Sequence, residues 1–128
     1  MMNVLFLSTY PPRACGIATF TQDLVRALNK TGKIETGIVA ISDGDYDYPT
    51  EVRFSLNQQD ANDYPAVAER INTSGADQLM IEHEFGIYGG KAGAYLLKLT
   101  PFLKIPYSVT LHTVLPKPTK KQKEIISS

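Results

Sequence analysis

The chain has 128 residues, of which 43% are hydrophobic and 20% are charged, so its composition is that of a folded domain and excludes a disordered, collagen-like or coiled-coil protein. Thirteen basic residues balance thirteen acidic ones, and a net charge of zero gives no general attraction to nucleic acid or to anionic lipid. With a single cysteine, no secretory signal and no apolar run near the ~20 residues that span a bilayer, we expect one cytoplasmic domain whose contact with a membrane is at most peripheral.

The first third of the sequence predicts a strand, a helix and a second strand. Residues 3–7 form a nearly continuous apolar run, typical of a buried strand, and Pro11-Pro12 breaks the pattern soon afterwards. From Gly16 to Leu28 apolar residues recur on one helical face, which predicts a helix of about four turns. Residues 34–41 are rich in β-branched side chains and predict the second strand.

The rest of the chain continues this alternation. Residues 43–59 are expected to be irregular, with one short strand at 52–56, and a helix is expected from N-cap candidates at 60–63 to Ser74-Gly75. Short strands are expected at 78–81 and 107–111. Between them we expect an amphipathic helix that opens at Gly89-Gly90 and is kinked or ended by Pro101. A last helix is expected at 119–126.

Strands that alternate with helices predict an α/β fold with a doubly wound, mainly parallel sheet, because parallel neighbours need crossover connections. In open sheets of this kind, ligands bind outside the carboxyl ends of the strands. The loops that follow residues 7, 81 and 111 are therefore the candidate site.

Gly16 begins the first predicted helix, where exposed backbone N–H groups and the positive end of the helix dipole favour a phosphate. The loop is neither a GxGxxG nor a Walker A motif, which disfavours a dinucleotide dehydrogenase or a P-loop NTPase. Gly16 has an alternative explanation, a tight turn with close packing of helix on strand. Cys15, beside it, is either a packing residue or a thiol with a lowered pKa that could pair with His112.

Both histidines follow predicted strands. His83 lies between Glu82 and Glu84, and in extended chain it faces away from both. His112 ends the last predicted strand, where an imidazole can bond a sugar hydroxyl or titrate near neutral pH. Each histidine could instead be a polar loop residue satisfied by the backbone. Together with the two glutamates they also admit a small metallohydrolase, although their spacing matches no established zinc pattern.

The three loops resemble those of the N-terminal domain of retaining glycosyltransferases with the GT-B fold, of the family 4 type. The likeness covers almost the entire chain in the expected order, and it is carried by Tyr10-Pro11-Pro12, Cys15-Gly16-Ile17-Ala18-Thr19-Phe20, Ile81-Glu82-His83-Glu84-Phe85-Gly86 and Thr110-Leu111-His112-Thr113. Many members of that family have two adjacent glycines where this chain has Cys15-Gly16.

The resemblance implies transfer of a hexose from a nucleotide sugar with retained anomeric configuration, with no metal and no other cofactor. It assigns the donor's diphosphate to Gly16 and Cys15. It implies that His112, which orients the donor sugar, and His83 are the catalytic residues. Glu84 and Thr113 become candidates for the acceptor side.

The same resemblance implies a second domain that makes most of the nucleotide contacts and is absent from these residues. Residues 1–128 would then be a single Rossmann-like, acceptor-side domain that is inactive alone. Its partners would be a nucleotide-sugar donor and a carbohydrate or lipid-linked acceptor, not a nucleic acid. The alternative is a stand-alone α/β ligand-binding or regulatory module without catalysis.

Overall fold

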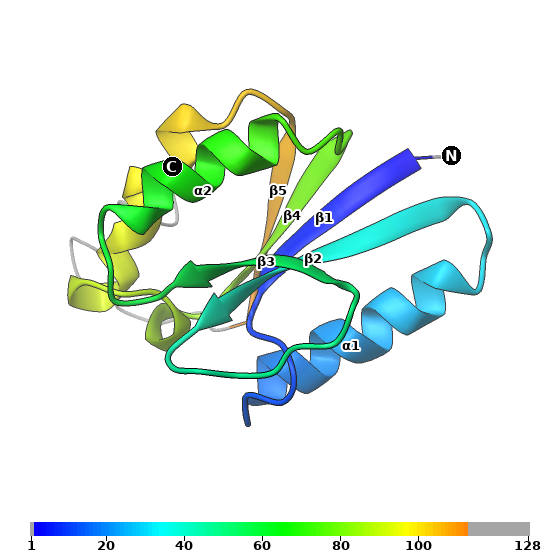
Figure 1. Ribbon diagram of the computed structural model, residues 1–128, viewed down its shortest axis with the longest axis horizontal. Helices are drawn as coiled ribbons and strands as arrows, with labels where there is room; N and C mark the ends of the chain where they lie inside the picture. The colour runs from blue at the N-terminus through cyan, green and yellow to red at the C-terminus, as the bar shows by residue number, and fades with distance from the viewer. Residues whose placement is uncertain (1, 113–128) are drawn as a thin grey trace.

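The computed structural model describes residues 2–112, which form a five-stranded parallel sheet with helices on both faces (Figure 1). The strand order is β3-β2-β1-β4-β5. The strands are β1 (Met2–Ser8), β2 (Ile34–Ser42), β3 (Val52–Asn57), β4 (Gln78–His83) and β5 (Tyr107–Leu111), and the α-helices are α1 (Gly16–Asn29) and α2 (Asp63–Asn72). The predicted fold class, an α/β Rossmann-like fold with a parallel sheet, is confirmed.

The core consists of two layers of apolar side chains, one on each face of the sheet. Successive residues of a strand point to opposite faces, so in β1 Val4 and Phe6 pack under α1 while Leu5 and Leu7 pack under α2. Figure 1 shows the two helices on opposite sides of the sheet. The continuous apolar run of β1 follows from burial on both faces, which is the normal situation of a parallel strand.

The predicted strands and the first two helices are found close to their expected bounds. The strand expected at 52–56 is β3, which extends to Asn57 and pairs in parallel with β2 at one edge of the sheet. The helix expected after residues 60–63 is α2, which buries Tyr64, Val67, Ala68 and Ile71. Local periodicity was therefore sufficient to predict these elements.

The prediction of an amphipathic α-helix after Gly89-Gly90 is wrong. The segment instead forms two 3-10 helices, η2 (Lys91–Lys98) and η3 (Thr100–Phe102), and another, η1 (Phe85–Ile87), precedes them. Gly90 and Gly93 have φ of 80° and 76°, and left-handed residues cannot continue an α-helix. The apolar spacing is nevertheless used, because Leu96 and Leu99 are buried.

Two sequence predictions lie outside the described residues, namely the helix at 119–126 and the candidate Thr113. Among the helices formed by residues 2–112, none combines the length and the apolar character that crossing a bilayer requires.

Candidate functional site

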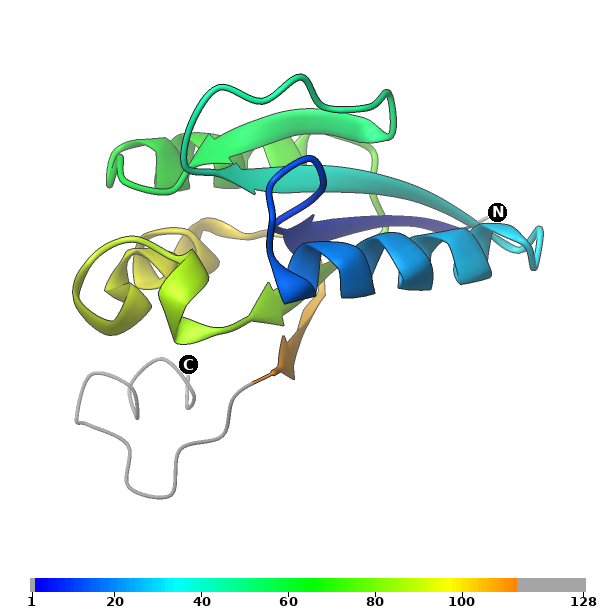
Figure 2. The same cartoon turned by 90° about the horizontal axis from the view of Figure 1, so that it is seen from below.

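The strand order places the topological switch point of the sheet between β1 and β4. From β1 the chain passes through α1 to β2 on one side, whereas α2 returns it to β4 on the other side of β1. Connections that leave in opposite directions separate at the carboxyl ends of the two strands, and ligands of open α/β sheets bind at that switch point. In Figure 2 the first turn of α1 lies beside the carboxyl ends of β1 and β4.

His112 lies at this position, directly after β5. Its backbone N–H donates to the carbonyl of His83, with 2.9 Å between N and O, which continues the pairing of β5 with β4. Its ring meets the ring of Phe20 edge-on, with centroids 4.9 Å apart. Phe20 is one helical turn after Gly16, so the structure brings His112 and the start of α1 together, as the sequence analysis expected.

Glu82 is the partner of the His112 ring. Nε2 of His112 lies 2.7 Å from Oε2 of Glu82, whose side chain is 1% exposed, against 19% for His112. The sequence analysis considered Glu82 only as a metal ligand and missed this pair. The parallel register sets Glu82 opposite Thr110. His112 is two residues after Thr110 and so lies on the same face. Pairing the two predicted strands in this register would have found the contact.

His83 points to the other face of β4, as its alternation with Glu82 predicts. Its ring is fully buried and stacks on Tyr88, with centroids 5.6 Å apart and planes 21° apart. Burial lowers the pKa of His83 below 6.5 because it disfavours the imidazolium, and the nearby charge of His112 lowers this pKa further. His83 therefore contributes its carbonyl to the site edge while its ring belongs to the core.

The loop after β4 is held by tyrosine hydroxyls. Tyr88 donates to the carbonyl of Glu82 at 2.7 Å, and the hydroxyl of Tyr64 accepts the N–H of Gly89 at 3.0 Å. Glu84, the acceptor-side candidate, is half-buried between β4 and η1.

The loop that leads into α1 is anchored at both ends. The hydroxyls of Ser8 and Thr21 are 2.8 Å apart and buried, which ties the end of β1 to α1. Arg13 donates to the carbonyl of Ile41 at 3.0 Å and lies 3.6 Å from the carboxylate of Asp43, which ties the loop to the end of β2. These contacts fix where α1 begins.

Gly16 is the first residue of α1 and is exposed. A Cβ built on it meets no atom within 4 Å, so close packing of helix on strand does not explain this glycine. The start of α1 is therefore open to solvent at Gly16, and a helix terminus of this kind is a place where an anion can bind.

Cys15 precedes this turn and is half-buried. Its Sγ accepts a hydrogen bond from the hydroxyl of Thr9 at 3.4 Å. Burial alone would raise the pKa of the Cys15 thiol, but the Thr9 hydroxyl and the backbone N–H groups of Ala18 and Ile17 outweigh it, so the pKa lies below 9.0. The side chain that hydrogen-bonds Cys15 is thus Thr9, whereas the ring of His112 pairs with Glu82.

A polar hollow of about 420 Å³ opens at the same edge of the sheet, beyond β2 and β3. Ser42, Asp43, Asp45, Asn57 and Asp63 are among the residues that line it. The sequence analysis treated this stretch as irregular surface and assigned it no role.

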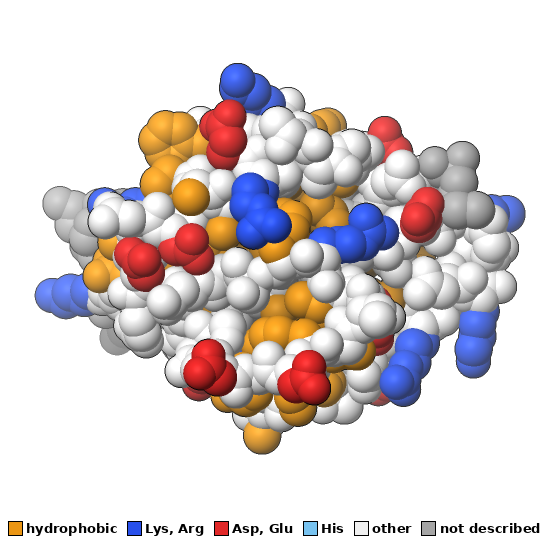
Figure 3. Space-filling model, in the orientation of Figure 1, with side chains coloured by type: hydrophobic (Ala, Val, Ile, Leu, Met, Phe, Trp, Pro, Cys, Tyr) orange, Lys and Arg blue, Asp and Glu red, His pale blue; other side chains and the backbone are white. Residues whose placement is uncertain are grey.

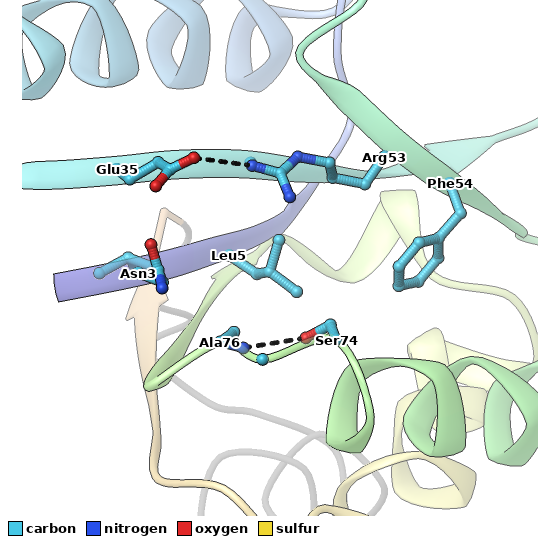
Figure 4. Close-up of a pocket in the computed structure, with 10 residues that line it drawn as sticks. Asn3, Leu5, Glu35, Arg53, Phe54, Ser74 and Ala76 are labelled. Carbon is cyan, nitrogen blue, oxygen red and sulfur yellow. Dashed lines mark hydrogen bonds and ion pairs between the residues drawn. The ribbon is translucent and has the colours of Figure 1, made fainter. Parts of the chain in front are cut away.

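A second hollow, of about 190 Å³, lies at the opposite edge, over the amino ends of β1, β2 and β3 (Figure 4). Leu5 and Phe54 line its floor, while Arg53 lies beside Glu35 with 3.9 Å between nitrogen and oxygen. Neither hollow is lined by Gly16 or by either histidine. On the face shown in Figure 3, acidic and basic groups are intermixed and hydrophobic groups reach the surface between them.

Among residues 2–112, no three side chains of His, Cys, Asp or Glu come close enough together to hold a metal ion. The pair of Glu82 and His112 stands apart from the ring of His83, which faces Tyr88.

No family model matches this chain. No curated protein matches it either. The function is therefore inferred from the geometry of the site and from the resemblance of the three loops.

Proposed function

We propose that this chain is the N-terminal, acceptor-side domain of a retaining glycosyltransferase that moves a hexose from a nucleotide sugar to an acceptor. One observation supports this proposal above the others: the start of α1, at the exposed Gly16, and the ring of His112 lie at the same switch point of the sheet. A nucleotide sugar presents an anionic diphosphate and a hydroxylated ring side by side. A helix terminus suits the first group, and an imidazole suits the second.

In this proposal the diphosphate approaches Gly16, where a side chain is absent and space is open. Negative charge develops on the diphosphate as it departs from the sugar, and fixed N–H dipoles stabilise charge that develops in a reaction. Cys15 borders the same N–H groups, so a bound phosphate and a Cys15 thiolate would compete for the same positive end of α1.

His112 orients the donor sugar through a hydrogen bond between its ring and a sugar hydroxyl. The catalytic role that the resemblance implies for His83 does not fit its buried ring, which stacks on Tyr88, so in this proposal His83 acts only through the carbonyl that accepts the N–H of His112. The acceptor side is assigned to Glu84 and Thr113, of which Thr113 lies outside the described residues. The donor is a nucleotide sugar and the acceptor a carbohydrate or a lipid-linked carbohydrate. The same proposal includes a second domain, which binds the nucleotide. It also includes a cytoplasmic location with peripheral membrane contact.

The test is hexose transfer by the full-length transferase that the proposal implies, with the anomeric configuration of the product read by NMR. His112→Ala is expected to lower turnover about 100-fold, the usual effect of losing one positioned group in such a site, while nucleotide binding changes little. Glu69→Gln, on the exposed side of α2, is the control and keeps wild-type turnover. Wild-type turnover in His112→Ala, or an inverted product, would overturn the proposal.

A further inference from the structure

The carboxylate of Glu82 is buried beside the site, and a buried carboxylate needs hydrogen bonds that replace those of water. Its Oε2 contacts the ring of His112, while its Oε1 is buried and has no hydrogen-bond partner among residues 2–112. His112 therefore provides the one side-chain hydrogen bond that Glu82 makes in this part of the chain. Such a strong mutual dependence between a loop imidazole and a core carboxylate calls for a functional explanation.

The chemistry of the two groups indicates which of them carries the shared proton. A carboxylate has only acceptor oxygens, so a hydrogen bond between Oε2 and Nε2 requires the proton to be on the ring. His112 therefore donates through Nε2–H to the carboxylate of Glu82. In the neutral ring, Nδ1 then carries a lone pair and is the nitrogen left for a ligand.

We propose that Glu82 is a positioning residue that fixes both the orientation and the tautomer of His112, so that the ring offers Nδ1 as a hydrogen-bond acceptor to a ligand hydroxyl. The identity of the ligand rests on the proposed function, in which a sugar hydroxyl donates a hydrogen bond to Nδ1. A carboxylate that holds one ring nitrogen commonly sets which nitrogen of a histidine is presented to substrate or metal.

Phe20 holds the same ring from a second direction. Its edge-on contact with His112 restricts rotation of the imidazole about its own side-chain bonds, while the hydrogen bond to Glu82 restricts tilt. The two contacts come from different elements, since Phe20 belongs to α1 and Glu82 to β4. Both hold His112, which follows a third element, β5. A contact that served only to hold β5 would duplicate the backbone hydrogen bond that His112 already makes to His83.

The first test is NMR of the histidine ring nitrogens in this chain, without ligand. In the wild type we expect the Nε2–H tautomer of His112 and a ring N–H proton that is slow to exchange and shifted downfield. Glu82→Leu removes the acceptor and abolishes that proton signal, whereas Glu82→Gln keeps an acceptor oxygen and retains a weaker one. Glu69→Gln removes a carboxylate elsewhere and leaves the signal unchanged. An Nδ1–H tautomer in the wild type, or an unchanged signal in Glu82→Leu, would overturn the inference even if one variant folds poorly.

The second test separates a positioning role from a purely structural one. In the full-length transferase, Glu82→Leu is expected to lower kcat about 10- to 100-fold with the KM for the nucleotide sugar unchanged, and Glu82→Gln to restore part of the loss. An unchanged kcat in a folded Glu82→Leu variant would contradict the positioning role. If no hexose transfer occurs in the wild type, the proposed function fails while the NMR test still decides the pairing of Glu82 with His112.

Discussion

Cys15 shows how the surroundings of one residue decide its chemistry. Burial raises the pKa of a thiol, yet the hydroxyl of Thr9 and the N–H groups of Ala18 and Ile17 outweigh burial and lower the pKa of Cys15. The thiolate is the reactive form of cysteine. A lone cysteine that composition alone describes as inert is therefore expected to react at moderate pH, because it borders the positive end of α1.

Alkylation of Cys15 by iodoacetamide is expected to reach half its maximal rate at a pH below 9.0. Thr9→Val keeps the shape of the side chain, removes the hydroxyl that donates to Sγ, and is expected to move that midpoint upward. Thr31→Val, an exposed change at the far end of α1, is the matched control and leaves the midpoint in place. A wild-type midpoint at or above that of a cysteine in an unstructured peptide would contradict this account.

The loop between β4 and η2 packs closely against α2 and the end of β3. The N–H of Gly89 donates to Tyr64 of α2, and the hydroxyl of Tyr64 donates to the carbonyl of Gln58, just after β3. A Cβ on Gly89 would lie far inside van der Waals contact with that carbonyl oxygen. The absence of a side chain at Gly89 therefore lets the loop that carries Glu84 pack against α2 and the end of β3.

Gly89→Ala is expected to destabilise the fold by about 1–3 kcal/mol or more, the usual cost of overpacking a tight site. Gly16→Ala provides a matched control, because its Cβ meets open space and the change should stay within about 0.5 kcal/mol of the wild type. Urea unfolding followed by circular dichroism measures both. Equal midpoints for the two variants would show that the loop moves freely to accept the added carbon.

For the whole molecule, the buried ring of His83 links stability to pH. The folded state lowers the pKa of His83, first through burial and then through the charge of His112, whereas the unfolded chain retains a value near 6.5. Below that value the unfolded state binds more protons than the folded state, so acid favours unfolding. The stabilisation is complete above pH 6.5 and is lost as the pH falls through the lowered pKa.

We expect the free energy of unfolding to decrease as the pH falls below 6.5, and the decrease to be smaller in His83→Gln, which does not titrate. Denaturant unfolding at several pH values measures both slopes. Asp43 acts in a separate window: its hydrogen bond from Tyr46, with Arg13 nearby, lowers its pKa below 3.8. Equal slopes for the wild type and His83→Gln above that window would contradict the assignment to His83.

Local periodicity in the sequence determined the parallel α/β fold, the bounds of β1, α1, β2 and α2, and the edge of the sheet where a site would lie. It determined them because a parallel strand buried on both faces is a continuous apolar run, and a helix repeats its buried positions about every 3.6 residues. The 3-10 form of residues 91–102 escaped prediction, since an apolar stripe does not report the left-handed backbone at Gly90 and Gly93.

Only the tertiary structure decided which polar groups meet. Glu82 and His112 are thirty positions apart, and their contact depends on β5 pairing with β4 in one register, a shift of which by a single residue would turn His112 to the other face. On the opposite face of β4, the ring of His83 is buried against Tyr88. Side-chain direction within a strand is a local property, but the neighbour that each side chain meets is set by strand order, which no local pattern encodes.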